Sequence, residues 1–211
     1  MNGSVLVVCP TRGRPAKAEK MAESFKATTN YRSKLLLLID DDDPSDYSAL
    51  IRSDICETAV RPRTDIVPMI NRAIRERLHD YSFFGLMVDD GVFTTPGWDQ
   101  FVALATPMGG VMSPAHNYGR HVDMPYVHRR WVERLGWYAN ERFKYWCWPT
   151  FTGILAQAAG RIVHAPKESF YIHHDDMGPG RWEDFKTEAN VFYEECLWNL
   201  WPLVDKLNAD D

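Results

Sequence analysis

Two adjacent aspartates, Asp89 and Asp90, follow an apolar run at residues 83–88 and precede Gly91. Paired carboxylates at the end of a buried strand can hold a hard divalent cation, because Mg²⁺ and Mn²⁺ prefer oxygen ligands and take others from substrate phosphates. Such a cation neutralises a diphosphate leaving group. A simple Asp-Asp-Gly turn is the alternative. The Thr-Thr-Pro-Gly-Trp segment at residues 94–98 favours the metal site.

A second acidic run, residues 40–43, ends the apolar segment at residues 35–39. A carboxylate in this place can accept a hydrogen bond from a uracil imide or a ribose hydroxyl. Asp41 and Asp42 are therefore candidates for binding a nucleoside, and a solvated loop or helix cap is the alternative. Like charges around one ion repel each other. We therefore do not expect both acidic clusters to bind the same cation.

A third polar cluster, Pro10-Thr11-Arg12-Gly13-Arg14-Pro15, follows the apolar run at residues 5–9. Arg12 and Arg14 can each bind a phosphate through two parallel hydrogen bonds, and Gly13 allows close approach of the backbone. The segment is neither a G-x-G-x-x-G fingerprint nor a P-loop. It is predicted to bind phosphate or, alternatively, to be an exposed basic loop.

The elements that must position these clusters alternate between strand and helix patterns. Short apolar runs predict buried strands at residues 5–9, 35–39, 57–60 and 83–88, and helical spacing predicts helices at 16–27, 45–51 and 66–78. This order predicts an α/β fold, a doubly wound and mostly parallel sheet with helices on both faces. Ligands bind beyond the carboxyl ends of such strands, and all three polar clusters lie there.

The second half of the chain is rich in aromatic and basic residues between positions 111 and 148. Trp131, Trp146 and Trp148 can stack on an acceptor, although filling the core is the alternative. Further elements are expected as a helix at residues 151–159, strands at 161–164 and 169–172, and one or two helices within 182–207. His116, His121 and His128 lack metal-ligand spacing and are interpreted as surface or core residues.

Length and composition are typical of one globular domain. The 211 residues are 45% hydrophobic, so we expect a single domain over 1–211, with a nucleotide-binding half (1–100), an acceptor half (101–176) and a C-terminal helical segment (177–211). The formal net charge of −5 disfavours non-specific nucleic-acid binding. Four scattered cysteines indicate reduced thiols. Without a signal peptide or an apolar span, we expect a cytoplasmic protein that does not insert stably into membranes.

These motifs resemble those of family-2-like GT-A glycosyltransferases. In that family the first strand ends in a Pro/Thr-containing nucleotide loop, the second in a base-reading acidic pair and the fourth in a D-x-D-type motif. The matching segments here are residues 5–14, Ile39-Asp40-Asp41 and Met87-Val88-Asp89-Asp90. The resemblance covers residues 4–176. It implies the nucleotide-diphospho-sugar transferase fold, a ribose contact for Asp89 and a metal-ligand role for Asp90. It also implies a histidine ligand, His173 or His174, of which we favour His174.

The function implied by the resemblance is metal-dependent sugar transfer from a nucleotide-diphosphate donor, with a UDP-sugar favoured, to a hydroxyl acceptor. Mn²⁺ or Mg²⁺ is the implied cofactor. The acceptor stays open between a glycan, a lipid-linked sugar, a protein and a hydroxylated DNA base. The implied donor-binding residues are Thr11, Arg12, Arg14, Asp41, Asp42 and Asp89.

The expected catalytic acid is missing from its usual place. Inverting members carry an Asp or Glu near the start of the helix that follows the acceptor region, whereas residues 146–153 contain neither. A general base must reach the acceptor hydroxyl. The nearby candidates are, in order, Glu141, Asp123 and Glu133. Whether the sugar configuration is inverted or retained therefore stays open.

Two other functions remain as alternatives. A non-catalytic module that binds a nucleotide-sugar or a glycan would explain the missing acid, and turnover would distinguish it from an enzyme. A sugar-phosphate nucleotidyltransferase would need a glycine-rich loop with a distal lysine after the first strand. Residues 10–15 do not provide one.

Overall fold

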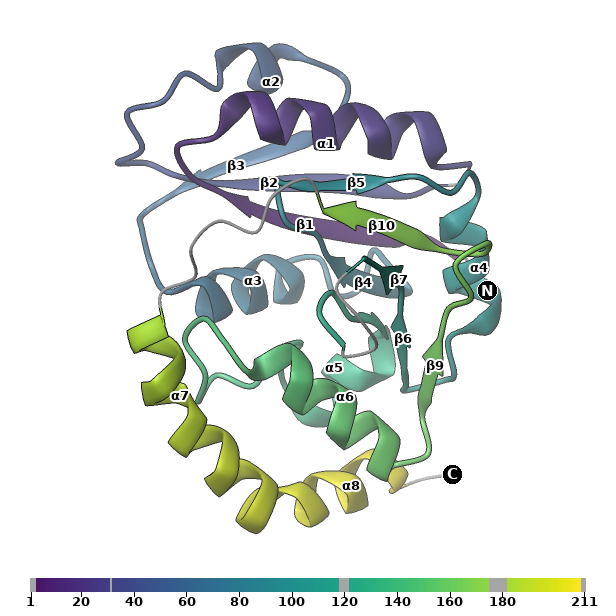
Figure 1. The fold of residues 1–211 in the computed structure, drawn as a ribbon. Coiled ribbons are helices and arrows are strands. Elements are labelled where there is room, and N and C mark those ends of the chain that lie inside the picture. Colours follow the sequence, from purple (N-terminus) through teal and green to yellow (C-terminus); the bar gives the residue numbers. More distant parts are fainter. Residues whose placement is uncertain (1–2, 31, 118–121, 175–181, 210–211) are drawn as a thin grey trace.

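The strands of the computed structural model, which describes residues 3–30, 32–117, 122–174 and 182–209, form two sheets (Figure 1). The larger sheet has the strand order β3-β2-β1-β4-β8-β6-β9. Its members are β1 (Val5–Thr11), β2 (Lys34–Asp40), β3 (Glu57–Arg61), β4 (Phe83–Leu86), β6 (Val111–Ser113), β8 (Tyr126–His128) and β9 (Ile162–His164). Among these described strands only β8 runs antiparallel to its neighbours. The α/β class and the mostly parallel sheet are thus as predicted.

Successive side chains of the central strands enter two different cores. Leu6 and Val8 pack with α3 (Ile66–Arg75), α5 (Arg129–Leu135) and α6 (Trp148–Ala158). Val5 and Val7 pack with α1 (Pro15–Thr28), α2 (Ser48–Arg52) and α4 (Trp98–Ala105). Because a strand points alternate side chains to opposite faces, helices on both faces require the continuous apolar runs that the sequence shows. This is the doubly wound arrangement.

The smaller sheet has three short strands, β5 (Gly91–Phe93), β7 (Ala115–His116) and β10 (Tyr171–His174), in the order β5-β10-β7. β10 is antiparallel to β5, with His174 opposite Gly91, and parallel to β7. The sequence did not predict β5 or β7, because strands of two or three residues carry too little pattern. It also placed the two histidines after the last strand, whereas both belong to β10. This sheet carries His174 to the segment that holds Asp90.

Several predicted boundaries are also corrected. The strand predicted at residues 83–88 ends at Leu86, and the helix predicted at 151–159 begins at Trp148, with Pro149 in its first turn. A proline is tolerated there because the first N–H groups of a helix have no intrahelical partner. Helices α4 and α5 were not predicted. No helix in the described part of the chain combines the length and apolarity needed to cross a bilayer.

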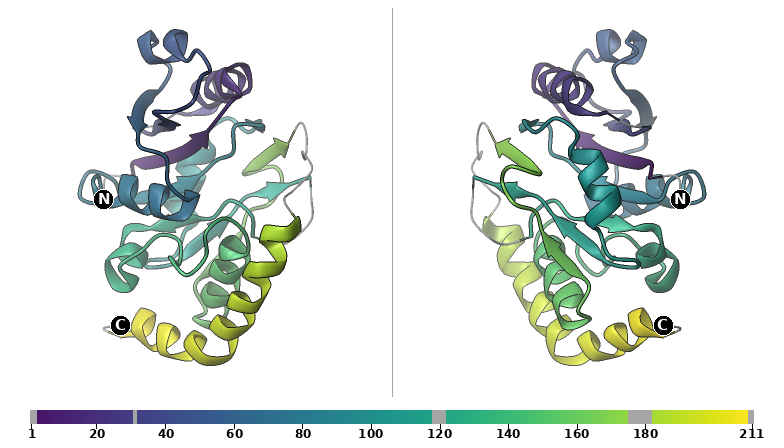
Figure 2. Two further views of the ribbon diagram at one scale, coloured as in Figure 1. Left: turned by 90° about the vertical axis from the view of Figure 1, so that its left-hand side faces the viewer. Right: turned by 90° about the vertical axis from the view of Figure 1, so that its right-hand side faces the viewer.

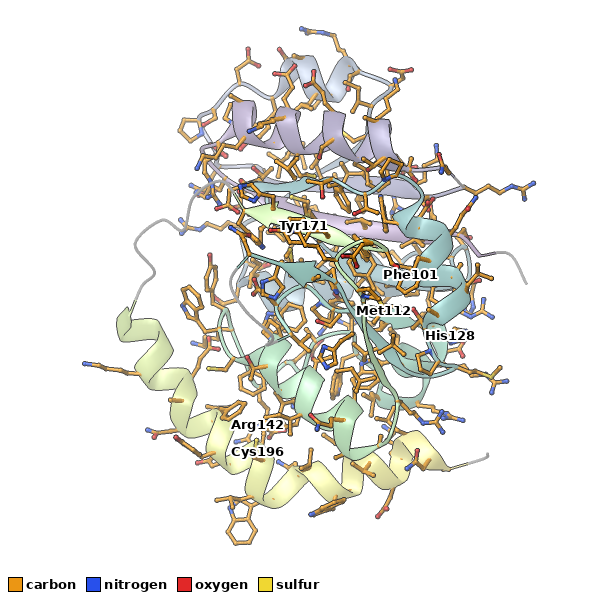
Figure 3. The ribbon with its side chains drawn as sticks, turned by 45° about the vertical axis from the view of Figure 1, so that its right-hand side comes forward. Phe101, Met112, His128, Arg142, Tyr171 and Cys196 are labelled. Atoms are coloured by element: carbon orange, nitrogen blue, oxygen red, sulfur yellow. The ribbon has the colours of Figure 1, made fainter. Side chains whose placement is uncertain are left out.

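The C-terminal helices curve along the side of the molecule opposite α1 and α2 (Figure 2). They are α7 (Trp182–Glu194), a π-helical turn (Glu195–Asn199) and α8 (Leu200–Asn208). At the turn, the buried Glu195 accepts hydrogen bonds from Asn140 Nδ2 (2.6 Å), Arg142 Nη1 (2.5 Å) and Asn199 Nδ2 (2.7 Å). Figure 3 shows Arg142 and Cys196 at this junction. Glu195 therefore fastens the C-terminal segment to the loop after α5.

Glu195→Ala is expected to lower the free energy of unfolding by about 2–4 kcal/mol, because it removes the buried partner of Asn140 and Arg142. For a chain of this size the melting temperature should fall by about 5–10 °C. Glu194→Ala is the matched control. It removes an exposed partner of the same arginine, 2.8 Å away, and should cost less than about 1 kcal/mol. Equal effects of the two variants in thermal and urea unfolding would contradict the anchoring role of Glu195.

Candidate functional site

The loops that follow β1 and β4 are joined through Asp89. Thr11 Oγ1 donates a hydrogen bond to Asp89 Oδ2 at 2.7 Å, and Arg14 Nη2 lies 2.7 Å from Asp89 Oδ1. Arg14 also reaches Asp90, with Nη1 3.6 Å from Oδ2. Asp89 is almost fully buried, and this burial, with repulsion from Asp90, raises the pKa of its carboxyl group although Thr11 and Arg14 oppose the shift. Thr11 and Arg14, both predicted to bind the donor, therefore lie in contact with the acidic pair.

The loop after β1 is shaped by the acidic run after β2. Arg12 Nη1 donates to Asp40 at 2.9 Å and also contacts Asp42. The Gly13 N–H donates to Asp43 Oδ2 at 2.7 Å. Gly13 has a φ of 71°, a conformation that residues with a Cβ rarely adopt. The acidic run and the basic loop thus hold each other in a fixed conformation.

The two acids predicted to bind the nucleoside differ in their surroundings. The Asp42 carboxylate is paired with Arg12, and this hydrogen bond is the main cause of its lowered pKa. The Asp41 side chain is exposed, while its backbone N–H donates to the Arg61 carbonyl at 2.8 Å. Both side chains are exposed, so the difference between them is the ion pair through which Asp42 positions Arg12.

His174 lies beside the acidic pair, with its Nδ1 3.9 Å from Asp90 Oδ1. Its backbone is held by Asn117, whose Oδ1 accepts from the His174 N–H at 3.0 Å and whose Nδ2 donates to the His174 carbonyl at 3.2 Å. Burial raises the pKa of Asp90, but the interactions with His174 and Arg14 outweigh it and lower the pKa overall. His174 is buried and His173 exposed, so alternation along β10 turns His174 towards Asp90.

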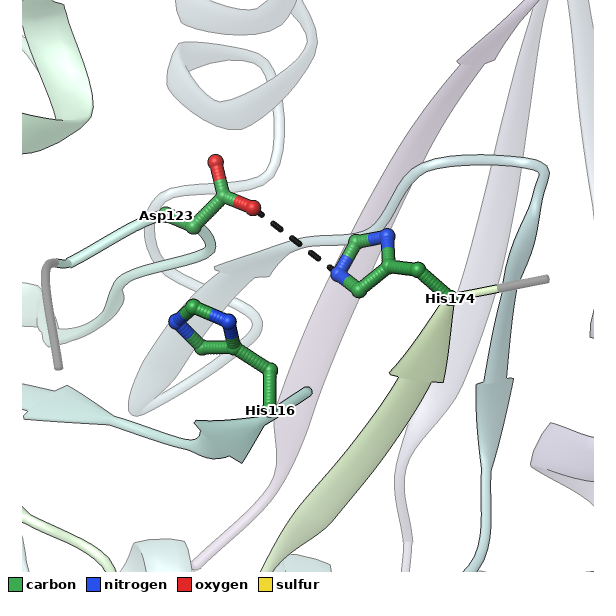
Figure 4. A group of neighbouring side chains, drawn as sticks. All are labelled: His116, Asp123 and His174. Atoms are coloured by element: carbon green, nitrogen blue, oxygen red, sulfur yellow. Dashed lines mark ion pairs between the residues drawn. The ribbon is translucent and has the colours of Figure 1, made fainter. Parts of the chain in front are cut away.

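A second group of ligand-type side chains surrounds the other nitrogen of the same imidazole (Figure 4). His174 Nε2 lies 3.8 Å from Asp123 Oδ2, and the ring of His116 lies 6.1 Å from that of His174 between centroids. One ligand atom from each of the three residues lies within 4.8 Å of the others. The sequence interpretation of His116 as a surface or ordinary core residue missed this group. Its members come from segments whose spacing carries no metal motif.

The three acids considered as general bases lie in different surroundings. Glu141 Oε1 accepts from Asn71 Nδ2 at 3.0 Å and Arg75 Nη1 at 2.9 Å, both on α3. Glu133 forms an ion pair with Arg129, one turn earlier on α5, at 3.1 Å. Asp123 is the one of the three that contacts His174. Of the three acids, Asp123 therefore lies beside His174, whereas Glu141 and Glu133 are engaged by arginines.

The acceptor-binding tryptophans predicted from the sequence are corrected in part. Trp131 and Trp148 lie in the hydrophobic core, where Trp131 packs against Trp137 and Trp148 against Tyr138. Since a buried indole offers no free face to a ligand, these two residues have a packing role. Trp146 is half-buried beside the exposed Tyr145, 5.0 Å between ring centroids. It remains the candidate of the three for contact with a ligand.

The basic residues near Trp131 lie away from the acidic pair. Arg129 and Arg130 line a hollow of about 310 Å³ together with Ser82 and His128. Ser82 directly precedes β4, whereas Asp89 lies beyond the other end of that strand. The hollow is therefore at the opposite end of the sheet from Asp89.

The fold is that of the GT-A glycosyltransferases, an α/β domain whose mixed sheet is mostly parallel. S. aureus TarS is similar over 92% of this chain and 40% of its own, with a TM-score of 0.66 and 12% identity. The mannosyltransferase PcManGT from Pyrobaculum calidifontis, in complex with GDP-Man and Mn²⁺, is similar over 97% of this chain and 73% of its own, with a TM-score of 0.62 and 14% identity.

A structure of TarS residues 1–349 in complex with UDP-GlcNAc is similar over 99% of this chain and 68% of its own, with a TM-score of 0.63 and 10% identity. No protein-family model matches the chain, and no curated protein sequence matches it. At these identities the comparisons show the shared fold. The resemblance predicted from the motifs is confirmed at that level.

Proposed function

We propose that this protein transfers a sugar from a nucleotide-diphosphate donor to a hydroxyl acceptor, with a UDP-sugar as the favoured donor. The observation that carries the proposal is the convergence of Thr11, Arg14, Asp89, Asp90 and His174 at the carboxyl ends of the strands. Structures with this fold hold GDP-Man with Mn²⁺ or UDP-GlcNAc. The shared fold, together with this group of side chains, supports the same class of donor.

The side chains of Asp90 and His174 fit a divalent cation. Two ligands of one ion, each about 2.1 Å from it, lie roughly 3–4 Å apart, and Asp90 Oδ1 and His174 Nδ1 are separated by 3.9 Å. We propose Mn²⁺ or Mg²⁺, and the imidazole nitrogen favours Mn²⁺. When bound, the ion supplies positive charge to the diphosphate leaving group.

The proposed donor contacts follow from the charges around the acidic pair. Arg14 is 44% exposed in its side chain, so its guanidinium can turn from Asp89 and Asp90 to a phosphate. Asp89 is then available to accept a hydrogen bond from a ribose hydroxyl, and the exposed Asp41 to accept one from the base. Arg12 stays held by the acidic loop and contributes positive charge.

For the transfer step we propose Asp123 as the general base. Its carboxylate would take the proton of the acceptor hydroxyl while the acceptor oxygen bonds to the anomeric carbon. The bond from that carbon to the donor phosphate breaks, and the nucleoside diphosphate leaves with the electron pair. The contact of Asp123 with His174 places it beside the proposed donor site, which supports this role over Glu141.

A binding experiment tests the donor site. UDP with Mn²⁺ at about 100 times its dissociation constant should stabilise the fold by about 2.7 kcal/mol and raise the melting temperature by about 5–10 °C. Asp90→Asn should abolish this shift, and so should EDTA. Asp54→Asn is the control, because this exposed acid pairs with Lys26 at 3.1 Å before the start of β3. Equal stabilisation of wild type and Asp90→Asn would contradict the proposed cation site.

One observation favours a second candidate, a non-catalytic nucleotide-sugar-binding module. The segment that opens α6, Trp148-Pro149-Thr150-Phe151, carries no acid. A module of this kind would give the same UDP shift without turnover. Release of UDP from a UDP-sugar, by transfer or by slow hydrolysis, distinguishes the enzyme from the module.

A further inference from the structure

We propose that His116, Asp123 and His174 form a second metal site, selective for a borderline transition metal such as Zn²⁺ or Co²⁺. This site uses the opposite nitrogen of His174 from the one that faces Asp90. The existence of the site does not depend on the proposed function. Its consequence, that metal bound here inhibits sugar transfer, does rest on it.

The three side chains already lie close to a coordination geometry. One ligand atom of each lies within 4.8 Å of the others, whereas ligands about 2.1 Å from a tetrahedral ion lie roughly 3.4 Å apart. Side-chain movements of about 1 Å therefore close the site. Figure 4 shows His116 and His174 at the ends of two strands and Asp123 on a loop facing them.

The backbone around the site is held in place independently of any metal. Residues 115 and 116 of β7 pair with residues 171 and 172 of β10. Asn117 adds two hydrogen bonds to the backbone of His174. His116 and His174 are buried, and Asp123 is half-buried. Little conformational freedom is therefore left to lose when an ion binds.

The donor set determines which metals fit. Two imidazoles and one carboxylate are typical ligands of Zn²⁺, Co²⁺ and Fe²⁺, whereas Mg²⁺ and Ca²⁺ prefer oxygen ligands alone. Three protein ligands leave one position for water, as in metal sites that are not closed. The chemistry thus points to a transition metal in exchange with solvent.

The shared histidine links the two sites. Its Nδ1 lies 3.9 Å from Asp90 Oδ1 and its Nε2 lies 3.8 Å from Asp123 Oδ2. Because these nitrogens point to different sides of one ring, an ion bound to Nε2 is not the ion bound between Nδ1 and Asp90. With Nε2 ligated, an Nδ1–H would donate to Asp90, a common arrangement around metal-bound histidines. His174 would then no longer be a ligand of the donor cation, and Asp123 would be bound to the second metal.

The test measures Co²⁺ and Zn²⁺ binding to the metal-free protein without nucleotide, by calorimetry and by the visible absorption of Co²⁺. Wild type should bind one ion, and His116→Ala should weaken binding at least about tenfold. If circular dichroism shows that His116→Ala folds poorly, His116→Gln, which keeps a polar side chain, replaces it. This variant should also weaken Co²⁺ and Zn²⁺ binding at least about tenfold. His164→Ala, at the exposed end of β9, should bind as wild type does.

The two sites should separate in paired variants. Asp90→Asn should keep Co²⁺ binding and lose the Mn²⁺-dependent UDP shift. His116→Ala should lose Co²⁺ binding and keep the UDP shift. His174→Ala should lose both. Unchanged Co²⁺ binding in both His116 variants, or no binding by wild type, would overturn the second site. If wild type binds Co²⁺ but shows no UDP shift, the proposed function fails while the second site stands.

Discussion

Asp90→Asn is expected to lower the rate of nucleoside diphosphate release from a nucleotide-sugar by about 10²–10³-fold, the usual cost of losing one group that stabilises developing charge. The carboxylate of Asp90 lies 3.9 Å from His174 and 3.6 Å from Arg14. It is the acid through which a cation would be held against the diphosphate. An amide in its place keeps the size but removes the negative charge. The measurement is UDP release from UDP-GlcNAc and other UDP-sugars in Mn²⁺.

The control for this prediction is Asp54→Asn, which changes the formal charge equally at the amino end of β3 and should leave the rate within about twofold of wild type. Raising the Mn²⁺ concentration should recover part of the activity of Asp90→Asn, because the variant loses metal affinity. If Asp90→Asn releases UDP as fast as wild type at low Mn²⁺, Asp90 is not a ligand of the cation. Equal losses in both variants would point to a general effect of charge.

The first half of the fold could be predicted because its strands carry a strong signal. β1 and β2 bury side chains on both faces, so Val5 to Val8 and Leu35 to Leu38 form unbroken apolar runs. The polar clusters begin where these runs end. Since parallel strands present their carboxyl ends at one edge, the meeting of Thr11 with Asp89 could be expected from the order of the motifs along the chain.

The second half could not be predicted to the same extent. β5, β7 and β10 have only two to four residues, and the pairing that brings His116 to His174 joins segments far apart in the sequence. Composition also cannot show whether a tryptophan binds a ligand or packs in the core, because this depends on its burial in the folded structure. Trp131 and Trp148 resemble ligand-stacking residues in the sequence, yet both fill the core between the sheet and its helices. Asp123 belongs to no motif, and its place 3.8 Å from His174 became visible only in the structure.

The choice between Asp123 and Glu141 as the general base leads to the second large effect. Asp123→Asn is expected to lower kcat for transfer by about 10²–10⁴-fold, the usual contribution of a positioned acid or base. Glu141→Gln should change kcat by less than about threefold, because Glu141 Oε1 is already engaged by Asn71 and Arg75 on α3. Both rates are measured at saturating donor, with the protein stripped of transition metals and supplied with Mn²⁺ alone.

Donor binding separates a lost base from a damaged site. If Asp123 acts only on the acceptor proton, Asp123→Asn should keep the full melting-temperature shift with UDP and Mn²⁺ while kcat falls. Loss of the shift together with activity would instead mean that Asp123 holds His174 in place for the donor cation. The opposite result is a large loss of kcat in Glu141→Gln and no loss in Asp123→Asn. It would mean that Glu141, in the loop after α5, is the general base. The acceptor would then have to reach the surface beside Arg75, on α3.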